Sequence, residues 1–166
     1  MKKYINLKLY LYLLIIFFVF LLDRVSKVYI LNLADLNGEV SIYINNFLNF
    51  ILIWNEGIGF GLFSNDSKFY YNTFTALIII INIIIIYLML TSKDFRGYIF
   101  SVILGGSLGN LFDRLYYSAV PDFIDLNYNN FHWFVFNVAD IFITVGIMCL
   151  ILVELFFNKH ELNDQK

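Results

Sequence analysis

Long apolar runs, separated by short polar segments, dominate the pattern of this 166-residue chain. A helix needs about 20 mostly apolar residues to cross a bilayer. Four segments approach that length, at about 9–28, 70–90, 98–115 and 138–157, and the third is rich in glycine. The pattern predicts an all-α membrane protein with four transmembrane helices, organised as one polytopic domain over residues 1–166.

The two long connections, about 31–68 and 116–137, have a different pattern, because they combine aromatic residues with short alternating runs. Segments 47–54 and 58–63 predict two short strands around a turn at 55–57. We therefore expect a small β-rich, aromatic cradle outside the membrane, between the first and second helices.

The composition supports a membrane environment and excludes several other classes of protein. Hydrophobic residues make up 60% of the chain and charged residues 14%, whereas soluble domains average about 45–50% apolar and about 25% charged residues. The mean hydropathy is +0.74. A water-soluble globule, a disordered segment and a basic nucleic-acid-binding module are therefore excluded. The single cysteine, Cys149, lies in an apolar run and supplies neither a disulfide framework nor a thiolate metal site.

Basic residues indicate the orientation, because Lys and Arg gather on the cytoplasmic side of membrane proteins. Seven of the eleven Lys and Arg residues precede the first predicted span, separate the second from the third, or follow the fourth: Lys2, Lys3, Lys8, Lys93, Arg96, Lys159 and Lys166. We expect both termini to face the cytoplasm and both long connections to lie outside. The start also resembles a secretory signal peptide, but no small-residue cleavage site follows, so we expect an uncleaved first span.

Polar residues gather near the predicted outer ends of these spans. An Asp at the centre of a membrane-spanning helix costs about 2.5–3.5 kcal/mol on insertion scales, so such groups are functional candidates. They are Asp23, Lys27, Asn110, Asp113, Arg114, Asp122, Asn137 and Asp140. Structural interpretations stand beside the functional ones. Asp23 and Lys27 have the spacing of a helical ion pair, and Asn137 has the position of a helix cap with Asp140 in the first turn.

Glycines and the single proline add local detail. Gly105 and Gly109 form a G-x-x-x-G pair, for which we expect close helix packing rather than chemistry. Pro121 stiffens the segment that presents Asp122. Asp125 is a competing acid that spacing does not exclude.

Paired carboxylates are the chemistry that these residues support best. The sequence offers no suitable Ser–His or Cys–His arrangement and no dense His or Cys pattern, so we expect neither a metal nor another cofactor. Two Asp residues in a poorly hydrated site share a proton, so one can activate water while the other polarises a carbonyl group. Spacing alone does not select the two acids.

Five segments together resemble the lipoprotein signal peptidase family, also called signal peptidase II. They are DRVSK at 23–27, NEGIGFGLF at 55–63, GGSLGNLFDR at 105–114, PDFID at 121–125 and FNVADIFITVG at 136–146, and they cover essentially the whole chain. The resemblance implies a monomeric aspartic endopeptidase of the bacterial cell (inner) membrane. Such an enzyme, surrounded by membrane lipids, cleaves prolipoproteins on the N-terminal side of a diacylglyceryl-modified cysteine.

The same motifs imply roles for individual residues. Asp122 and Asp140 correspond to the catalytic acids, whereas Asp125 has no catalytic counterpart. Supporting or substrate-binding roles fall on Asp23, Lys27, Asn55, Gly57, Asn110, Asp113, Arg114, Asn137 and Ala139. Two positions depart from the family pattern. Gly59 stands where alanine is usual, and Pro121 replaces a more usual valine, which removes a backbone N–H beside the proposed catalytic acid.

Two other functions stay open at the level of sequence. A small proton-coupled transporter or channel subunit would use the same acids as a relay, which predicts acids at mid-span. The main polar residue at mid-span is instead Asn82, and Glu154 lies toward the cytoplasmic end of the fourth span. A non-catalytic membrane scaffold would use the acids only for helix caps and ion pairs.

Overall fold

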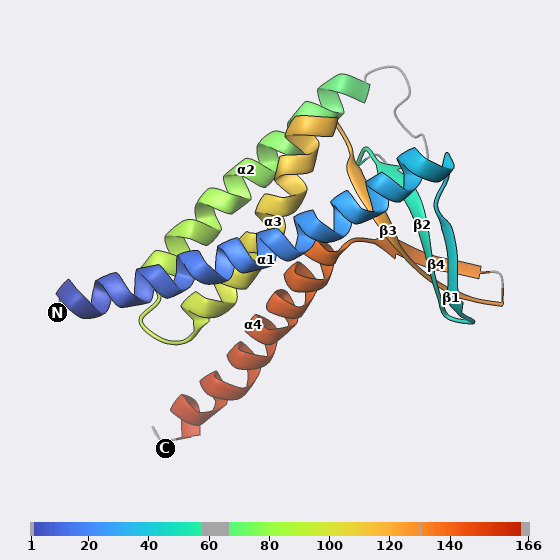
Figure 1. Cartoon of the computed structure of the whole chain (residues 1–166). Helices are drawn as coiled ribbons and strands as arrows, with labels where there is room; N and C mark the ends of the chain where they lie inside the picture. Colours follow the sequence, from blue (N-terminus) through green and yellow to red (C-terminus); the bar gives the residue numbers. More distant parts are fainter. Residues whose placement is uncertain (1, 58–66, 130, 164–166) are drawn as a thin grey trace.

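The computed structural model describes residues 2–57, 67–129 and 131–163. Within them, the order of elements is α1 (Lys2–Asn37), β1 (Ser41–Asn45), β2 (Leu48–Asn55), α2 (Ser67–Thr91), α3 (Arg96–Tyr117), β3 (Val120–Tyr128), β4 (Phe131–Phe136) and α4 (Val138–Asn163). The helices form a splayed bundle, and the strands lie together beside the C-terminal end of α1 (Figure 1). The N-terminal part of α1 and the C-terminal part of α4 both lie away from the sheet (Figure 1).

Helix α1 is longer than the segment that the sequence predicts. It has 36 residues, which correspond to about 54 Å at 1.5 Å per residue, whereas the hydrocarbon core of a bilayer is about 30 Å thick. Asp23 and Lys27 therefore lie inside the helix, which continues for ten residues beyond Lys27. The prediction that the membrane span ends near these two residues stays a prediction. The helix ends where Gly38 adopts a φ of +77° and donates its N–H to the carbonyl oxygen of Ala34 at 2.8 Å, a common C-terminal role of glycine.

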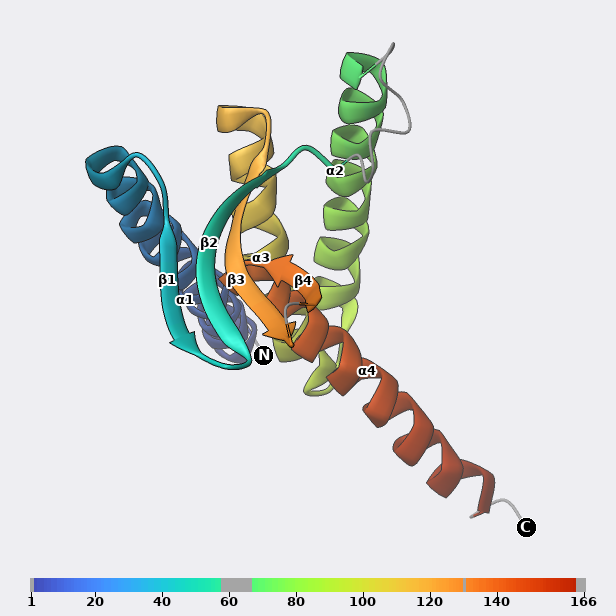
Figure 2. The same ribbon diagram turned by 90° about the vertical axis from the view of Figure 1, so that its right-hand side faces the viewer.

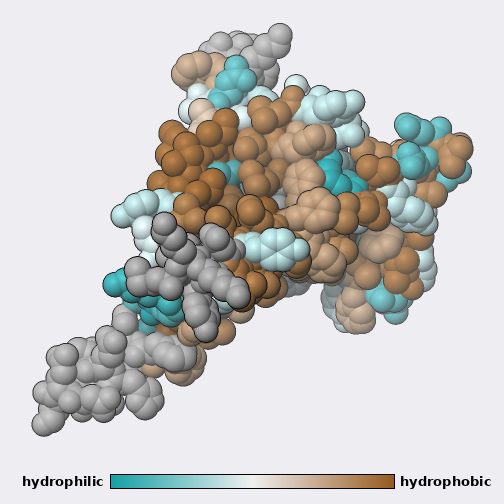
Figure 3. Space-filling model, turned by 60° about the vertical axis from the view of Figure 1, so that its left-hand side comes forward, coloured by the Kyte–Doolittle hydropathy of each residue, from teal (hydrophilic) through white to brown (hydrophobic). Residues whose placement is uncertain are grey.

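Within the described residues, three helices are long and apolar enough to cross a membrane. Their apolar segments are Leu7–Asn37 in α1, Tyr71–Thr91 in α2 and Val138–Phe156 in α4. Many of their large apolar side chains are exposed, and hydrophobic residues cover much of the described face seen in Figure 3. A continuous apolar surface of this kind marks contact with a membrane or a partner. Together with the length of the helices, it identifies a membrane protein.

Helix α3 occupies the centre of the bundle, where α1, α2 and α4 all pack against it. A Cβ atom on Gly105 would lie 2.9 Å from the carbonyl oxygen of Ile16, and one on Gly109 would lie 2.6 Å from Oδ2 of Asp23. Both glycines therefore allow α1 to approach closely, as the G-x-x-x-G spacing predicts. The predicted span at 98–115 falls within α3, which is not one of the three helices above, so this fourth span stays a prediction.

The strands form an antiparallel sheet with the order β1-β2-β3-β4 (Figure 2). β1 and β2 follow α1, whereas β3 and β4 connect α3 to α4. The expected β-rich cradle between the first two helices is therefore present as β1 and β2, but it is incomplete, because β3 and β4 from the second long connection complete the sheet. The predicted strand at 47–54 corresponds to β2, which pairs with β1 and β3. Its predicted partner at 58–63 lies outside the described residues.

A small apolar core holds the sheet against α1. Three buried residues contact one another: Ile30 of α1, Val40 just before β1, and Phe123 of β3. Burying side chains of this size contributes about 1.5–3 kcal/mol each. This core fixes the start of β3 close to the C-terminal third of α1, which brings the polar residues of both elements together.

Candidate active site

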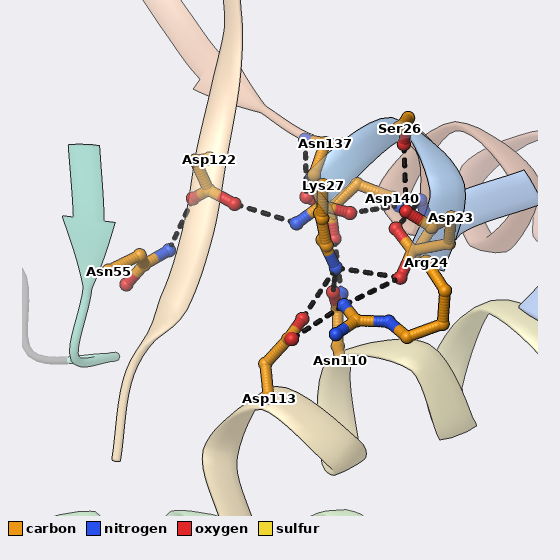
Figure 4. Close-up of polar contacts among 11 residues, drawn as sticks. Asp23, Arg24, Ser26, Lys27, Asn55, Asn110, Asp113, Asp122, Asn137 and Asp140 are labelled. Carbon is orange, nitrogen blue, oxygen red and sulfur yellow. Dashed lines mark hydrogen bonds and ion pairs between the residues drawn. The ribbon is translucent and has the colours of Figure 1, made fainter. Parts of the chain in front are cut away.

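Asp122 lies near the start of β3, where the sheet meets the helices (Figure 4). Its side chain is 3% exposed. Oδ2 accepts a hydrogen bond from Nδ2 of Asn55 at 2.9 Å, and Oδ1 accepts one from Nδ2 of Asn137 at 2.6 Å. Asn55 ends β2 and Asn137 immediately precedes α4. The sheet register and the start of α4 therefore position this carboxyl group together.

Asn137 and Asp140 begin α4 with a reciprocal cap. Oδ1 of Asn137 accepts the N–H of Asp140 at 3.2 Å, and the N–H of Asn137 donates to Oδ2 of Asp140 at 3.1 Å. This arrangement satisfies two N–H groups at the start of the helix. Since the side chain of Asn137 also donates to Asp122, the cap and the candidate site are the same structure. One residue thus contacts both candidate catalytic acids.

Asn110 of α3 connects Asp140 to a buried lysine. Its Nδ2 donates to Oδ1 of Asp140 at 2.7 Å, while its Oδ1 accepts a hydrogen bond from Nζ of Lys27 at 2.9 Å. Lys27 is completely buried and also donates to Asp23 at 2.9 Å and to Asp113 at 2.7 Å. The predicted ion pair between Asp23 and Lys27 is therefore present, as part of a network that reaches Asp140.

Arg24 belongs to this network, although the sequence analysis did not select it. Its guanidinium group contacts Asp113 and Asp23, and it lies 4.9 Å from the centre of the Phe112 ring. With Lys27, it balances the charges of the two buried acids, as buried charges require. The available signal was its place in DRVSK, but a basic residue near the end of a predicted span is equally typical of an interfacial anchor.

Ala139 connects α4 to α1 through its backbone. Its N–H donates to Oδ1 of Asp23 at 3.0 Å, so a carboxylate lies at the N-terminus of α4, where the helix dipole favours negative charge. A Cβ atom on Gly106 of α3 would lie 2.7 Å from the carbonyl oxygen of Ala139. Ala139 is completely buried, and the three helices meet at this point.

Gly57 and Arg114 lie at the edge of the site next to Asn55. Gly57 has a φ of +78°, and its N–H donates to Oδ1 of Asn55 at 2.8 Å. A Cβ atom there would lie 2.9 Å from Nη1 of Arg114, so both conformation and space favour glycine. The Tyr71 hydroxyl group donates to the carbonyl oxygen of Arg114 at 2.6 Å. Nε and Nη1 of Arg114 are buried and make no hydrogen bond to the described residues.

Two other acids lie apart from this cluster. Asp125 pairs with His132 of β4, on the sheet. Glu154 contacts Arg96 at 3.4 Å. It follows Asp140 by 14 residues of α4, about 21 Å along the helix, so Asp140 and Glu154 do not share a site.

Burial sets the proton affinity of Asp122. The pKa of this carboxyl group is raised from 3.8 to about 6, and loss of contact with solvent is the largest cause. The charge of Asp140 raises the pKa further, whereas the hydrogen bonds from Asn55 and Asn137 and the charge of Lys27 lower it. Asp122 therefore keeps a proton at a pH where an exposed Asp is ionised.

An apolar groove of about 550 Å³ opens beside Asp140, between β4 and α4. Its lining comprises Phe134, Val135, Phe136, Asp140, Ile141, Thr144 and Val145. The polar lining residues, Asp140 and Thr144, lie on one helix stripe, as their spacing predicts. No group of three or more His, Cys, Asp or Glu residues with the geometry of a metal site occurs in the described ranges.

Apolar helices that carry a small sheet, with two carboxyl groups linked through Asn137 at their junction, define a polytopic membrane protein with a candidate hydrolytic site. The family model described as Signal peptidase (SPase) II matches residues 15–157. The lipoprotein signal peptidase of Pelagibacter ubique (strain HTCC1062) is 57% identical over 162 residues, which cover 97% of this chain and 98% of that protein. The lipoprotein signal peptidase of Anaplasma phagocytophilum (strain HZ) is 42% identical over 136 residues, covering 81% and 85% respectively.

Solved structures agree with this result. Two structures described as bacterial membrane enzymes superimpose with TM-scores of 0.68 and 0.70 at 29% identity. Each covers 87% of this chain, and the matched parts are 87% and 92% of those chains. The chain belongs to the signal peptidase II, or lipoprotein signal peptidase, family, and it is therefore a peptidase that processes lipoproteins.

Proposed function

We propose that this peptidase is a membrane-embedded aspartic endopeptidase, a single domain over residues 1–166, in which Asp122 and Asp140 are the catalytic acids. The observation that carries the proposal is that Asn137 hydrogen-bonds both acids, through its side chain to Asp122 and through its N–H to Asp140. Two carboxyl groups held by one residue, with one of them buried, are suited to share a proton.

Their environments divide the chemistry between them. Asp122 is buried and its pKa is raised to about 6, so it carries the proton. Asp140, which is half-buried beside the groove, is the base. Asp140 takes a proton from water as the water oxygen bonds to the scissile carbonyl carbon, while Asp122 gives its proton to the carbonyl oxygen.

The resulting tetrahedral intermediate then collapses. The C–N bond breaks, Asp140 gives its proton to the leaving nitrogen, and one hydroxyl group of the intermediate returns a proton to Asp122. Both carboxyl groups end in their starting states, so the reaction needs no cofactor. Asn55 and Asn110 keep the two carboxyl groups oriented, since each donates to one of them.

The groove beside Asp140 supports a lipid-modified substrate. Apart from Asp140 and Thr144, its lining is apolar, which suits acyl chains or an apolar signal peptide that stays in the membrane. We propose cleavage of bacterial prolipoproteins on the N-terminal side of a diacylglyceryl-modified cysteine. The enzyme acts as a monomer, with membrane lipids around its apolar helices.

The placement of the elements supports an orientation in the bacterial cell (inner) membrane. Nζ of Lys8 donates to the carbonyl oxygen of Ser92 at 2.9 Å, so the N-terminal part of α1 and the connection between α2 and α3 lie together. That end of the bundle is opposite the sheet (Figure 1), and it is rich in basic residues. We therefore propose cytoplasmic termini, a fourth span in α3, and an active site toward the extracytoplasmic face.

Cleavage of a purified lipid-modified prolipoprotein by the purified enzyme tests the proposal. Asp122→Asn and Asp140→Asn should each lower turnover by at least about 10²-fold, because each removes a proton-transfer group that contributes about 10²–10⁴-fold. Glu154→Gln is the matched control and should retain turnover. Near-normal turnover of either Asp variant, or loss only with Asp113→Asn, would move the catalytic role to other residues.

A further inference from the structure

Asp125 is a completely buried acid that the proposed chemistry does not use. Its Oδ1 and Oδ2 lie 2.9 and 2.8 Å from Nδ1 of His132. Oδ2 also accepts a hydrogen bond from Nδ2 of Asn127 at 3.1 Å. A buried carboxylate is stable only with such partners. The side chain of His132 is 56% exposed, so the contact with Asp125 is a main constraint on its orientation.

The pair lies at an irregularity in the sheet. Leu126 is opposite Phe134, but the next residue, Asn127, is opposite His132, so β4 carries one additional residue, Trp133. An additional residue of this kind is a β-bulge, and such bulges reorient side chains near functional sites. Asp125 lies on one side of the bulge and His132 on the other, so their contact spans it.

The register of β4 determines where Asn137 lies. β4 ends at Phe136, which is opposite Ile124 of β3, and Asn137 follows directly. If β4 moved by one residue along β3, Asn137 would shift by about 3.4 Å, and the side chains of β4 would exchange faces of the sheet. A shift of that size would break the 2.6 Å hydrogen bond from Asn137 to Asp122.

We propose that the contact between Asp125 and His132 is a register lock, and that both residues are positioning residues for the peptidase reaction. They hold the bulge at Trp133 and thereby keep Asn137 within hydrogen-bonding distance of Asp122. The inference rests on the proposed catalytic role of Asp122. In this positioning role, Asp125 neither contacts the substrate nor transfers a proton.

The sharpest test compares His132→Asn with His132→Leu in the full-length enzyme. The Nδ2 of asparagine can occupy the place of the imidazole Nδ1 and donate to Asp125, whereas leucine has no donor. His132→Leu and Asp125→Asn should lower kcat about tenfold or more with KM changed less than twofold, since misplaced catalytic groups slow the chemical step. His132→Asn should retain at least half of kcat. Tyr128→Phe, on the same hairpin, is the matched control with unchanged kcat.

Each variant is measured per unit of folded protein, using size-exclusion profile and thermal unfolding. If His132→Leu does not fold, His132→Gln replaces it, because its longer side chain places the donor elsewhere. Unchanged kcat in His132→Leu or Gln, an effect on KM alone, or equal losses in the Asn and Leu variants would overturn the register lock. If Asp122→Asn stays active, the proposed function fails instead, so the two failures are distinguishable.

Discussion

Nδ2 of Asn137 donates a 2.6 Å hydrogen bond to Asp122, while Oδ1 of the same side chain accepts a hydrogen bond from the N–H of Asp140. The first contact orients a candidate catalytic acid, and the second begins α4. A single side chain therefore couples the geometry of the site to the stability of a membrane helix. Substitutions can separate the two contacts, because serine at position 137 keeps only the helix cap and alanine keeps neither contact.

Asn137→Ser should preserve the helix cap but lose the contact with Asp122, because serine is a good N-cap and its side chain is too short to reach Asp122. Turnover of the lipid-modified substrate should fall at least tenfold with little change in thermal unfolding. Asn137→Ala should show the same loss of turnover and a further loss of stability of about 1 kcal/mol. Normal turnover in both variants would contradict the positioning role of Asn137.

Lys27→Met should destabilise the protein by about 3–5 kcal/mol, because it leaves two buried acids with one base. Both Asp23 and Asp113 are completely buried and both contact Lys27. Adding Asp113→Asn should recover part of this loss, since it restores the balance with Arg24. Unfolding in detergent or lipid measures both variants. If Lys27→Met were as stable as the unmodified protein, the buried ion-pair network would have no structural importance.

The sequence predicted what depends on local spacing and missed what depends on pairing between distant elements. Asn137 and Asp140 are three residues apart, so their shared helix face and their cap follow from the helical repeat. The contact of Asp122 with Asn55 joins residues 67 apart, and it exists only because β3 pairs with β2. No periodic pattern records that pairing, so the local pattern predicted a cradle between the first two helices and did not predict that β3 and β4 complete it.

The contacts of Arg24 and His132 could not be predicted from the sequence for a related reason. A basic residue near the end of an apolar run and a histidine among aromatic residues are both typical of a membrane interface. Only the fold shows that each instead contacts a buried acid, Asp113 for Arg24 and Asp125 for His132. The family resemblance includes Arg24 within DRVSK but gives it no role, and none of the five motifs includes His132.

The pH dependence of turnover should show a decline with rising pH around 6. The active state needs one proton on the acid pair, and Asp122, whose pKa is raised to about 6 by burial, loses its proton as the pH rises through that value. The hydrogen bond from Asn55 lowers the pKa of Asp122. Asn55→Ala should therefore move the decline to higher pH, as measured by kcat over a pH series. A shift to lower pH would contradict the assignment of the proton to Asp122.

Asn82 offers a test of stability that is independent of catalysis. Its side chain is 4% exposed within α2, and its amide nitrogen and oxygen make no hydrogen bond to the described residues. An unpaired buried polar group costs about 1–3 kcal/mol. Asn82→Leu, which keeps the branched shape of the side chain, should therefore raise the free energy of unfolding by about that amount. Turnover should not change.

Thr75→Val is the matched control on the same helix. Thr75 is also buried, but its hydroxyl group donates to the carbonyl oxygen of Tyr71 at 2.9 Å. Replacing this hydroxyl group therefore removes a satisfied hydrogen bond and should not stabilise the protein. Thermal unfolding in the same detergent should rise for Asn82→Leu and stay level or fall for Thr75→Val. If Asn82→Leu instead lowered the unfolding temperature, the amide group would have a stabilising partner in the membrane, such as a bound water molecule, and α2 would depend on it.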